Sequence, residues 1–181
     1  WALRKRGKGP ALMISPLISL MDDQREQFRR FSEDLESKPE LSLRGGEGGG
    51  YTSAFLTAAE PRHVPQLMAE FGRGGIDLLC CSPEVMMMRS ENMMWVDKMA
   101  RMDEPVSLLI VDEAHIVGDW GATIRPDFQL LGWVRDRLLM ANPDLRIVLM
   151  SATISESERD ELRRIFLSPG MDYNETKVTK T

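Results

Sequence analysis

Residues 107–115 read SLLIVDEAH, an apolar run that leads directly into two adjacent carboxylates. A run without alternating polar side chains is typical of a strand that is buried on both faces of a parallel sheet. We therefore expect a strand over residues 107–111, with Asp112 and Glu113 at its carboxyl end. This strand sets the class of fold into which the rest of the chain has to fit.

Four further apolar runs alternate with helix-like stretches along the chain. We expect strands at 11–14, 54–57, 76–81 and 146–150. All but the run at 54–57 are continuously apolar, which predicts strands covered on both faces. The alternation is typical of an α/β domain, in which helices pack on the faces of a parallel sheet.

Apolar spacing and capping residues predict the helices. One helix is expected after Pro16 and a second is expected to begin at Pro126. The apolar residues that mark them are Leu20, Phe28, Phe31 and Leu35 in the first, and Phe128, Leu131, Val134 and Leu138 in the second. Ser155 and Glu158 form a capping box for a third helix. The methionines between positions 86 and 102 are expected on one helix, where they fill the core.

Composition limits the classes of function. The chain has 181 residues, of which 43% are hydrophobic and 28% charged, the mixture of one globular domain. No apolar run approaches the roughly 18 residues of a membrane span, and the first residues do not read as a signal peptide. The net charge of −5 argues against a generally basic nucleic-acid surface, so any such contact has to be local.

The two cysteines, Cys80 and Cys81, are neighbours in the sequence. A disulfide between neighbours is geometrically improbable, and two thiols are too few for a zinc site. We expect buried, reduced thiols in a cytoplasmic protein. Because the sequence starts at Trp1 and ends in polar residues, we also expect a piece of a longer protein.

Polar segments follow four of the apolar runs, at the point where each predicted strand ends. They are Ser15-Pro16, Ser82-Pro83-Glu84, Asp112-Glu113-Ala114-His115 and Ser151-Ala152-Thr153. The carboxyl ends of parallel strands lie on one rim of a sheet, where open α/β sheets bind their ligands. We therefore expect these segments to form one site.

Asp112 and Glu113 are the strongest candidates for chemistry. At the rim, an aspartate can hold Mg²⁺ on the phosphates of a nucleotide, and a neighbouring glutamate can position or deprotonate water for attack on the γ-phosphate. An isolated pair of acids more often caps the start of a helix. The apolar run before them and His115 after them favour the catalytic interpretation.

The hydroxyl residues at the rim have two interpretations each. Ser151 and Thr153 can hydrogen-bond to His115 or to the carboxylates and so report the state of the nucleotide, or they begin a helix. Ser15 and Ser82, each followed by a proline, can donate to phosphates of a nucleic-acid strand. The alternative is a helix N-cap with proline at the first helical position.

In this order, and between these strands, the polar segments resemble the motifs of the first RecA-like domain of superfamily-two helicases, most of all those of the RecQ family. The resemblance covers nearly the whole chain. Ser15-Pro16 and the residues after it resemble motif Ia, and Ser82-Pro83-Glu84 resembles motif Ib; both motifs contact DNA. DEAH at 112–115 resembles motif II, the Walker B box, and SAT at 151–153 resembles motif III.

The resemblance implies a fold, cofactors and a partner. It implies a RecA-like parallel sheet with helices on both faces, of the P-loop NTPase class, that uses ATP and Mg²⁺ and acts on single-stranded or partly duplex DNA. The implied site residues are Asp112 for the metal, Glu113 and His115 for catalysis, Ser151, Ala152 and Thr153 for coupling, and Ser15, Pro16, Ser82 and Pro83 for DNA.

The stretch at 115–128, HIVGDWGATIRPDF, resembles the aromatic-rich loop that links DNA occupancy to ATP hydrolysis in RecQ enzymes. The matching residues implied to bind nucleic acid are Trp120, Arg125 and Phe128. Aromatic rings can stack on unpaired bases while a guanidinium supplies positive charge. The alternative is that the two rings cover a helix.

One element of ATP-dependent helicases is absent from the sequence. The 181 residues contain no G-x-x-x-x-G-K-[ST] phosphate loop, which in the family precedes the strand at 11–14. A second RecA-like domain is expected to follow. We therefore expect a fragment, with residues 1–10 as a basic lead-in, 11–168 as an incomplete first RecA-like domain and 169–181 as a polar tail.

The sequence thus predicts part of an ATP-dependent DNA helicase, in which ATP hydrolysis drives movement along DNA and strand separation. It is expected in the cytoplasm, at the nucleoid of a bacterium or in the nucleus of a eukaryote, and the fragment alone is expected to be inactive. Two alternatives stay open. One is a non-catalytic nucleic-acid-binding or adaptor module derived from a helicase domain, and the other is an RNA helicase of the same superfamily.

Overall fold

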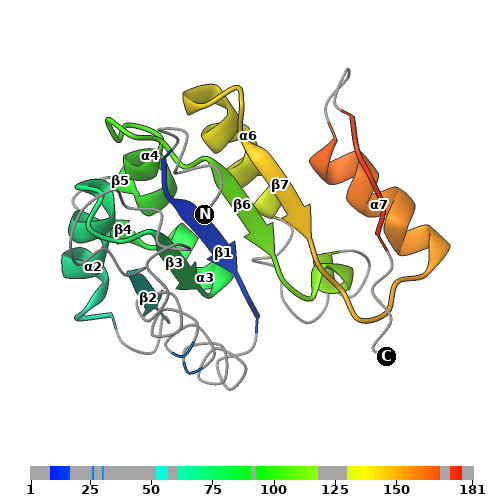
Figure 1. Ribbon diagram of the computed structural model, residues 1–181, viewed down its shortest axis with the longest axis horizontal. Helices are drawn as coiled ribbons and strands as arrows, with labels where there is room; N and C mark the ends of the chain where they lie inside the picture. The colour runs from blue at the N-terminus through cyan, green and yellow to red at the C-terminus, as the bar shows by residue number, and fades with distance from the viewer. Residues whose placement is uncertain are drawn as a thin grey trace, which may run out of the picture.

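The computed structural model describes residues 9–16, 26, 30, 52–56, 61–90, 93–117, 130–167 and 172–176. Within these ranges the chain forms a five-stranded sheet in the order β2-β3-β1-β6-β7, in which every neighbouring pair is parallel (Figure 1). The strands are β1 (Ala11–Ile14), β2 (Ser53–Leu56), β3 (Leu78–Cys81), β6 (Leu108–Val111) and β7 (Arg146–Leu149). All five predicted strands and the α/β class are confirmed.

Helices lie between the strands and after the last one. They are α2 (Val64–Gly72), α3 (Pro83–Met87), α4 (Trp95–Met99), the short 3-10 helix η2 (Ala114–Val117), α6 (Leu131–Ala141) and α7 (Glu156–Phe166). The predicted capping box of α7 is present, because the Ser155 hydroxyl and the Glu158 carboxylate each accept from the other residue's backbone N–H. None of the helices in the described ranges is long and apolar enough to cross a membrane.

Parts of two predicted helices lie outside the described residues. For the helix after Pro16, the structure describes only Glu26 and Arg30, which are helical and form an ion pair of 2.9 Å; its apolar markers Leu20, Phe28, Phe31 and Leu35 lie outside. For α6, the predicted apolar residues Leu131, Val134 and Leu138 are buried, as expected. Its predicted start at Pro126, and Phe128, also lie outside.

The main core lies on one face of the sheet. Leu12 stands between Leu79 and Leu109 in the strand register, and these buried side chains form one cluster with residues from α2, α3, α4, α6 and α7. The other face carries a smaller cluster of Met13, Phe55 and Cys80. Since the helix after Pro16 is not described, helices on both faces stay a prediction.

The prediction that β7 is covered on both faces is wrong. Its side chains alternate between exposed and half-buried, and that of Val148 is 42% exposed. Val148 pairs with Ile110 on the face of the smaller cluster of Met13, Phe55 and Cys80. That cluster does not extend to β7, which ends the described strand order. An apolar run therefore marks a strand here but does not mark a fully buried one.

The prediction of one methionine-rich helix is also wrong. α3 and α4 are separated by the antiparallel pair of β4 (Arg89–Ser90) and β5 (Met93–Met94), and the backbone is extended at Met88 and Met94. Ser90 and Asn92, residue types that favour turns over helices, interrupt the run. The expected core role is confirmed, since Met86 and Met99 are buried.

The amino ends of the strands are fastened by polar side chains that bind the backbone. The Ser107 hydroxyl donates to the carbonyl oxygen of Gly9, and the backbone N–H of Thr52 donates to the Asp77 carboxylate at 2.9 Å. Gly9 is required there, because a Cβ would lie 1.9 Å from the carbonyl oxygen of Pro105. These contacts satisfy backbone groups that are buried between strands.

Candidate functional site

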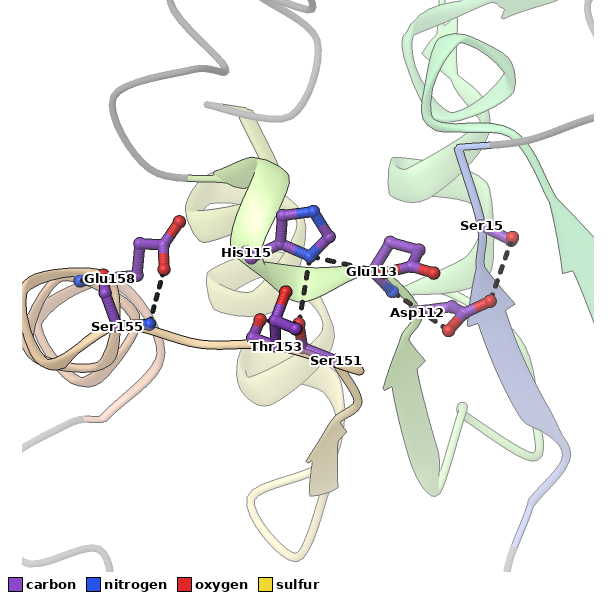
Figure 2. Close-up of polar contacts among 8 residues, drawn as sticks. All are labelled: Ser15, Asp112, Glu113, His115, Ser151, Thr153, Ser155 and Glu158. Carbon is purple, nitrogen blue, oxygen red and sulfur yellow. Dashed lines mark hydrogen bonds and ion pairs between the residues drawn. The ribbon is translucent and has the colours of Figure 1, made fainter.

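Three predicted segments meet at the carboxyl rim of β1, β6 and β7. Sheet pairing continues one residue beyond these strands, since the backbone N–H of Asp112 donates to Ile14 O at 2.9 Å and that of Met150 donates to Val111 O at 2.8 Å. Figure 2 shows Ser15, Asp112, Glu113, His115 and Ser151 along this rim, with polar contacts between neighbours. The expectation that distant polar segments gather there holds for these residues.

Asp112 is held at both carboxylate oxygens. Oδ1 accepts from the backbone N–H of Glu113 at 3.0 Å, and Oδ2 accepts from the Ser15 hydroxyl at 3.3 Å. The residue is 9% exposed. Burial, and secondarily the charge of Asp112, raises the pKa of Cys80 to about 12, so this thiol stays protonated at neutral pH. Both cysteines are free and buried, as predicted.

Glu113 has a left-handed backbone, with a φ of 48°. This region is uncommon for a residue with a Cβ, and within the described chain Glu113 is the one non-glycine residue that adopts a positive φ. Hydrogen bonds on either side enforce it, from Ala114 N to Met150 O at 2.8 Å and from Ile116 N to Glu113 O at 3.0 Å. Such strain is concentrated at functional sites, and here it falls on the predicted catalytic acid.

The His115 side chain contacts both Glu113 and the segment that follows β7. Its Nδ1 lies 2.9 Å from Ser151 Oγ and 3.3 Å from Glu113 Oε2 (Figure 2). The Ser151 hydroxyl donates its single hydrogen to the carbonyl oxygen of Thr153. Ser151 Oγ is therefore an acceptor toward the imidazole, which places the proton on Nδ1. That N–H also faces the Glu113 carboxylate, so one ring atom connects the acid with the segment after β7.

Ser82 and Pro83 stand at the end of β3, next to β1. Ser82 is 3% exposed and precedes α3 at the N-cap position, but its side chain makes no capping bond. Its hydroxyl has no hydrogen-bond partner among the described residues. A buried hydroxyl without a partner costs about 1–3 kcal/mol, which a bound ligand can recover.

Apart from the Thr153 carbonyl oxygen, which accepts from Ser151, the remaining predicted site residues add no contact that can be described. Trp120, Arg125 and Phe128 lie outside the described residues. Pro16 is buried beside Ser15, and Ala152 and Thr153 are exposed on the segment after β7.

One contact was not indicated by the sequence. Ser15, predicted to bind nucleic acid, donates its hydroxyl to Asp112. Nothing in the local pattern signals this bond, because it depends on β1 lying beside β6. Spacing along the chain does not encode that order of strands.

The rim suits a magnesium ion that is bound together with a nucleotide. Within the described ranges, no group of three or more His, Cys, Asp or Glu side chains is arranged to hold a metal by itself. Magnesium is commonly bound by one or two carboxylates together with phosphate oxygens and water. The oriented Asp112 carboxylate fits that donor set.

The parallel sheet, with adjacent acids at its carboxyl rim, defines an α/β domain of the P-loop NTPase type. Residues 1–162 match the family model described as DEAD/DEAH box helicase, so the chain belongs to that family.

Curated relatives carry helicase names. The chain is 32% identical over 163 residues to ATP-dependent helicase SGS1 of Saccharomyces cerevisiae, covering 89% of this chain and 10% of the relative. It is 28% identical over 145 residues to the probable ATP-dependent DNA helicase RecS of Bacillus subtilis, covering 80% and 24%. It is 29% identical over 157 residues to ATP-dependent DNA helicase RecQ of Pasteurella multocida, covering 87% and 21%. The chain thus spans a quarter or less of these relatives.

A solved structure supports the fold. Helicase Lhr of Mycobacterium smegmatis, bound to ssDNA and AMP-PNP, superposes with a TM-score of 0.51 at 22% identity, covering 83% of this chain and 18% of that one.

Proposed function

We propose that this chain forms the Walker B and motif III part of the ATP site in a RecQ-related, ATP-dependent DNA helicase. The observation that carries the proposal is the connected rim, where Asp112, Glu113 and His115 follow β6 and contact residues after β1 and β7. An isolated helix cap would not need side-chain bonds to two neighbouring strands. The helicase names of the curated relatives support the same activity.

In the hydrolysis step, each rim residue has a distinct task. Mg²⁺, held by Asp112 together with the phosphates, would neutralise charge that develops on the transferred phosphoryl group. Glu113 orients the attacking water and accepts its proton. Its side chain is 25% exposed, so solvent reaches it, and the Nδ1–H of His115 restrains its Oε2 at 3.3 Å.

Coupling runs from the acid through His115 to Ser151. A change at Glu113 on hydrolysis alters the charge that faces Nδ1–H, and Ser151 lies 2.9 Å from that same atom. Thr153 accepts from Ser151, so the signal reaches the segment after β7. A chain of this kind carries coupling when it has two arrangements that both sites bias.

The DNA contacts are carried over from the family resemblance. Ser82 and Pro83, which resemble motif Ib, stand at the carboxyl end of β3 on the same side of the sheet as Ser15, and the resemblance assigns them to the DNA backbone. Trp120, Arg125 and Phe128 would bind unpaired bases. The phosphate loop and a second RecA-like domain would come from other parts of the whole protein, which we place with DNA at the nucleoid or in the nucleus.

The test is Glu113→Gln in the full-length protein, with ATP turnover measured with and without single-stranded DNA. We expect turnover to fall about 100-fold or more, since a positioned general base contributes about 10²–10⁴-fold. Binding of a fluorescent ATP analogue should stay within about threefold of wild type, because the amide keeps the shape of the side chain. Normal steady-state turnover in this variant would refute the proposal. Stimulation by RNA rather than DNA would assign the chain to an RNA helicase.

A further inference from the structure

We propose that Ser15 is a positioning residue for Asp112, so that its hydroxyl serves the metal-binding carboxylate rather than the DNA backbone. The inference rests on the proposed function, since it assigns Ser15 to the ATP side of the same site. It differs from the role that the motif resemblance implies, in which Ser15 contacts nucleic acid.

The surroundings of Ser15 favour the ATP side. The residue is 0% exposed, so its side chain presents no surface to a strand that arrives from solvent. Its backbone N–H donates to Cys81 O at 3.1 Å, which fixes it between β3 and β6. Its hydroxyl donates to Asp112 Oδ2 at 3.3 Å, a long hydrogen bond whose acceptor is charged.

The bond controls how Asp112 is aimed. Glu113 N fixes Oδ1 from the carboxylate's own strand, and Ser15 fixes Oδ2 from the neighbouring strand. Without the hydroxyl, Oδ2 loses the hydrogen bond that joins it to the segment after β1, so the orientation of the carboxylate is less restricted. Groups that orient a metal ligand in this way commonly contribute 10–100-fold to metal affinity or activity.

The same sheet provides a matched control in Ser107. Like Ser15, it is a buried serine, 1% exposed, next to a strand end, and its hydroxyl donates to a buried oxygen, that of Gly9. It stands at the amino end of β6, whereas Ser15 stands at the carboxyl end of β1. Ser107→Ala therefore removes a comparable hydrogen bond from the sheet without touching the rim.

The experiment compares Ser15→Ala, Ser15→Thr, Ser107→Ala and Asp112→Asn in the full-length protein. Binding of a fluorescent ATP analogue is titrated with Mg²⁺, and binding of labelled single-stranded DNA is measured by anisotropy without nucleotide or Mg²⁺. Thermal unfolding identifies any variant that fails to fold. Ser15→Thr keeps the hydroxyl, so it tests whether that group is sufficient.

We expect Ser15→Ala to raise the Mg²⁺ concentration for half-maximal analogue binding about tenfold while DNA affinity changes less than twofold. Ser107→Ala should change neither value, and Ser15→Thr should recover most of the loss. Weaker DNA binding with a normal Mg²⁺ requirement would overturn the inference, because the hydroxyl would then serve DNA. Equal behaviour of Ser15→Ala and Ser107→Ala would also overturn it. A normal Mg²⁺ requirement in Asp112→Asn would instead refute the proposed function, and this inference with it.

Discussion

The two ends of the same sheet use polar side chains differently. At the amino end, side chains bind backbone groups, as Ser107 does with Gly9, Asp77 with Thr52 and Asn142 with Val106 O at 3.0 Å. At the carboxyl end, Asp112 and Ser151 also bind backbone groups, but side chains there bind one another as well, as Ser15 does with Asp112 and His115 with Ser151. Both ends belong to the same strands, so the bonds between side chains are what distinguishes the carboxyl end.

The difference separates contacts that support the fold from contacts between the side chains of the candidate site. Side-chain bonds to the backbone satisfy donors and acceptors that folding would otherwise leave buried and unpaired. Bonds between side chains are the minority in proteins, about 10–15% of all hydrogen bonds. The carboxyl rim also holds the strained Glu113 backbone and the Ser82 hydroxyl, which is buried and has no hydrogen-bond partner among the described residues. Under the proposed function, these costly features serve ligand binding.

The largest effect that separates the two ends is expected at His115. In the full-length protein, His115→Ala should lower DNA-stimulated ATP turnover about tenfold, since coupling between two sites is typically about 5–150-fold. The reason is loss of the Nδ1–H that faces both Glu113 and Ser151. DNA affinity without nucleotide should be unchanged, which anisotropy measures. Equal loss of turnover with and without DNA would mean that His115 serves hydrolysis rather than coupling.

Asp77 at the amino end should behave in the opposite way. Asp77→Ala leaves the part-buried N–H of Thr52 without its acceptor, so we expect a loss of about 2 kcal/mol in the free energy of unfolding. Denaturant titration measures that loss. Turnover per folded molecule should match wild type below the unfolding transition. A specific loss of turnover in the folded variant would show that the two ends are not separate in role.

The positions of the strands and of the acids at the rim could be predicted from the sequence. The contacts that could not be predicted share one physical cause. Continuous apolar runs located the strands, and adjacent acids followed by histidine located the rim, because both signals are local. The contact of Ser15 with Asp112 and the exposure of Val148 were not predictable, since both depend on the order of strands in the sheet. Local spacing carries no information about that order.

The strain at Glu113 gives a stability test of the rim. Glycine adopts a positive φ without a Cβ penalty, whereas alanine does not. Glu113→Gly should therefore be more stable than Glu113→Ala by about 1 kcal/mol, which is the reverse of the order expected in an ordinary helix or strand. Thermal or denaturant unfolding of both variants measures the difference. Equal stability would mean that the backbone relaxes once the carboxylate is removed.

The smallest expected effect tests whether the position of a side chain or the kind of contact that it makes decides its role. The capping box of Ser155 and Glu158 lies on the carboxyl side of β7, close to His115, yet it binds backbone groups as the amino-end residues do. If the kind of contact decides the role of a side chain, Ser155→Ala should lower the free energy of unfolding by about 0.5–1 kcal/mol and leave ATP turnover unchanged.

The pH dependence of the capping box has a defined sign. The backbone N–H of Ser155 donates to Glu158 and, together with the Ser155 side chain, lowers the pKa of Glu158 below its ordinary value. A carboxyl group with a depressed pKa in the folded protein stabilises it above the unfolded-state pKa, and this stabilisation is lost as pH falls through the folded-state pKa. Glu158→Gln should therefore flatten the acid side of the stability profile without altering turnover. A change in turnover in either capping variant would mean that closeness to the rim, rather than the kind of contact, decides what these side chains do.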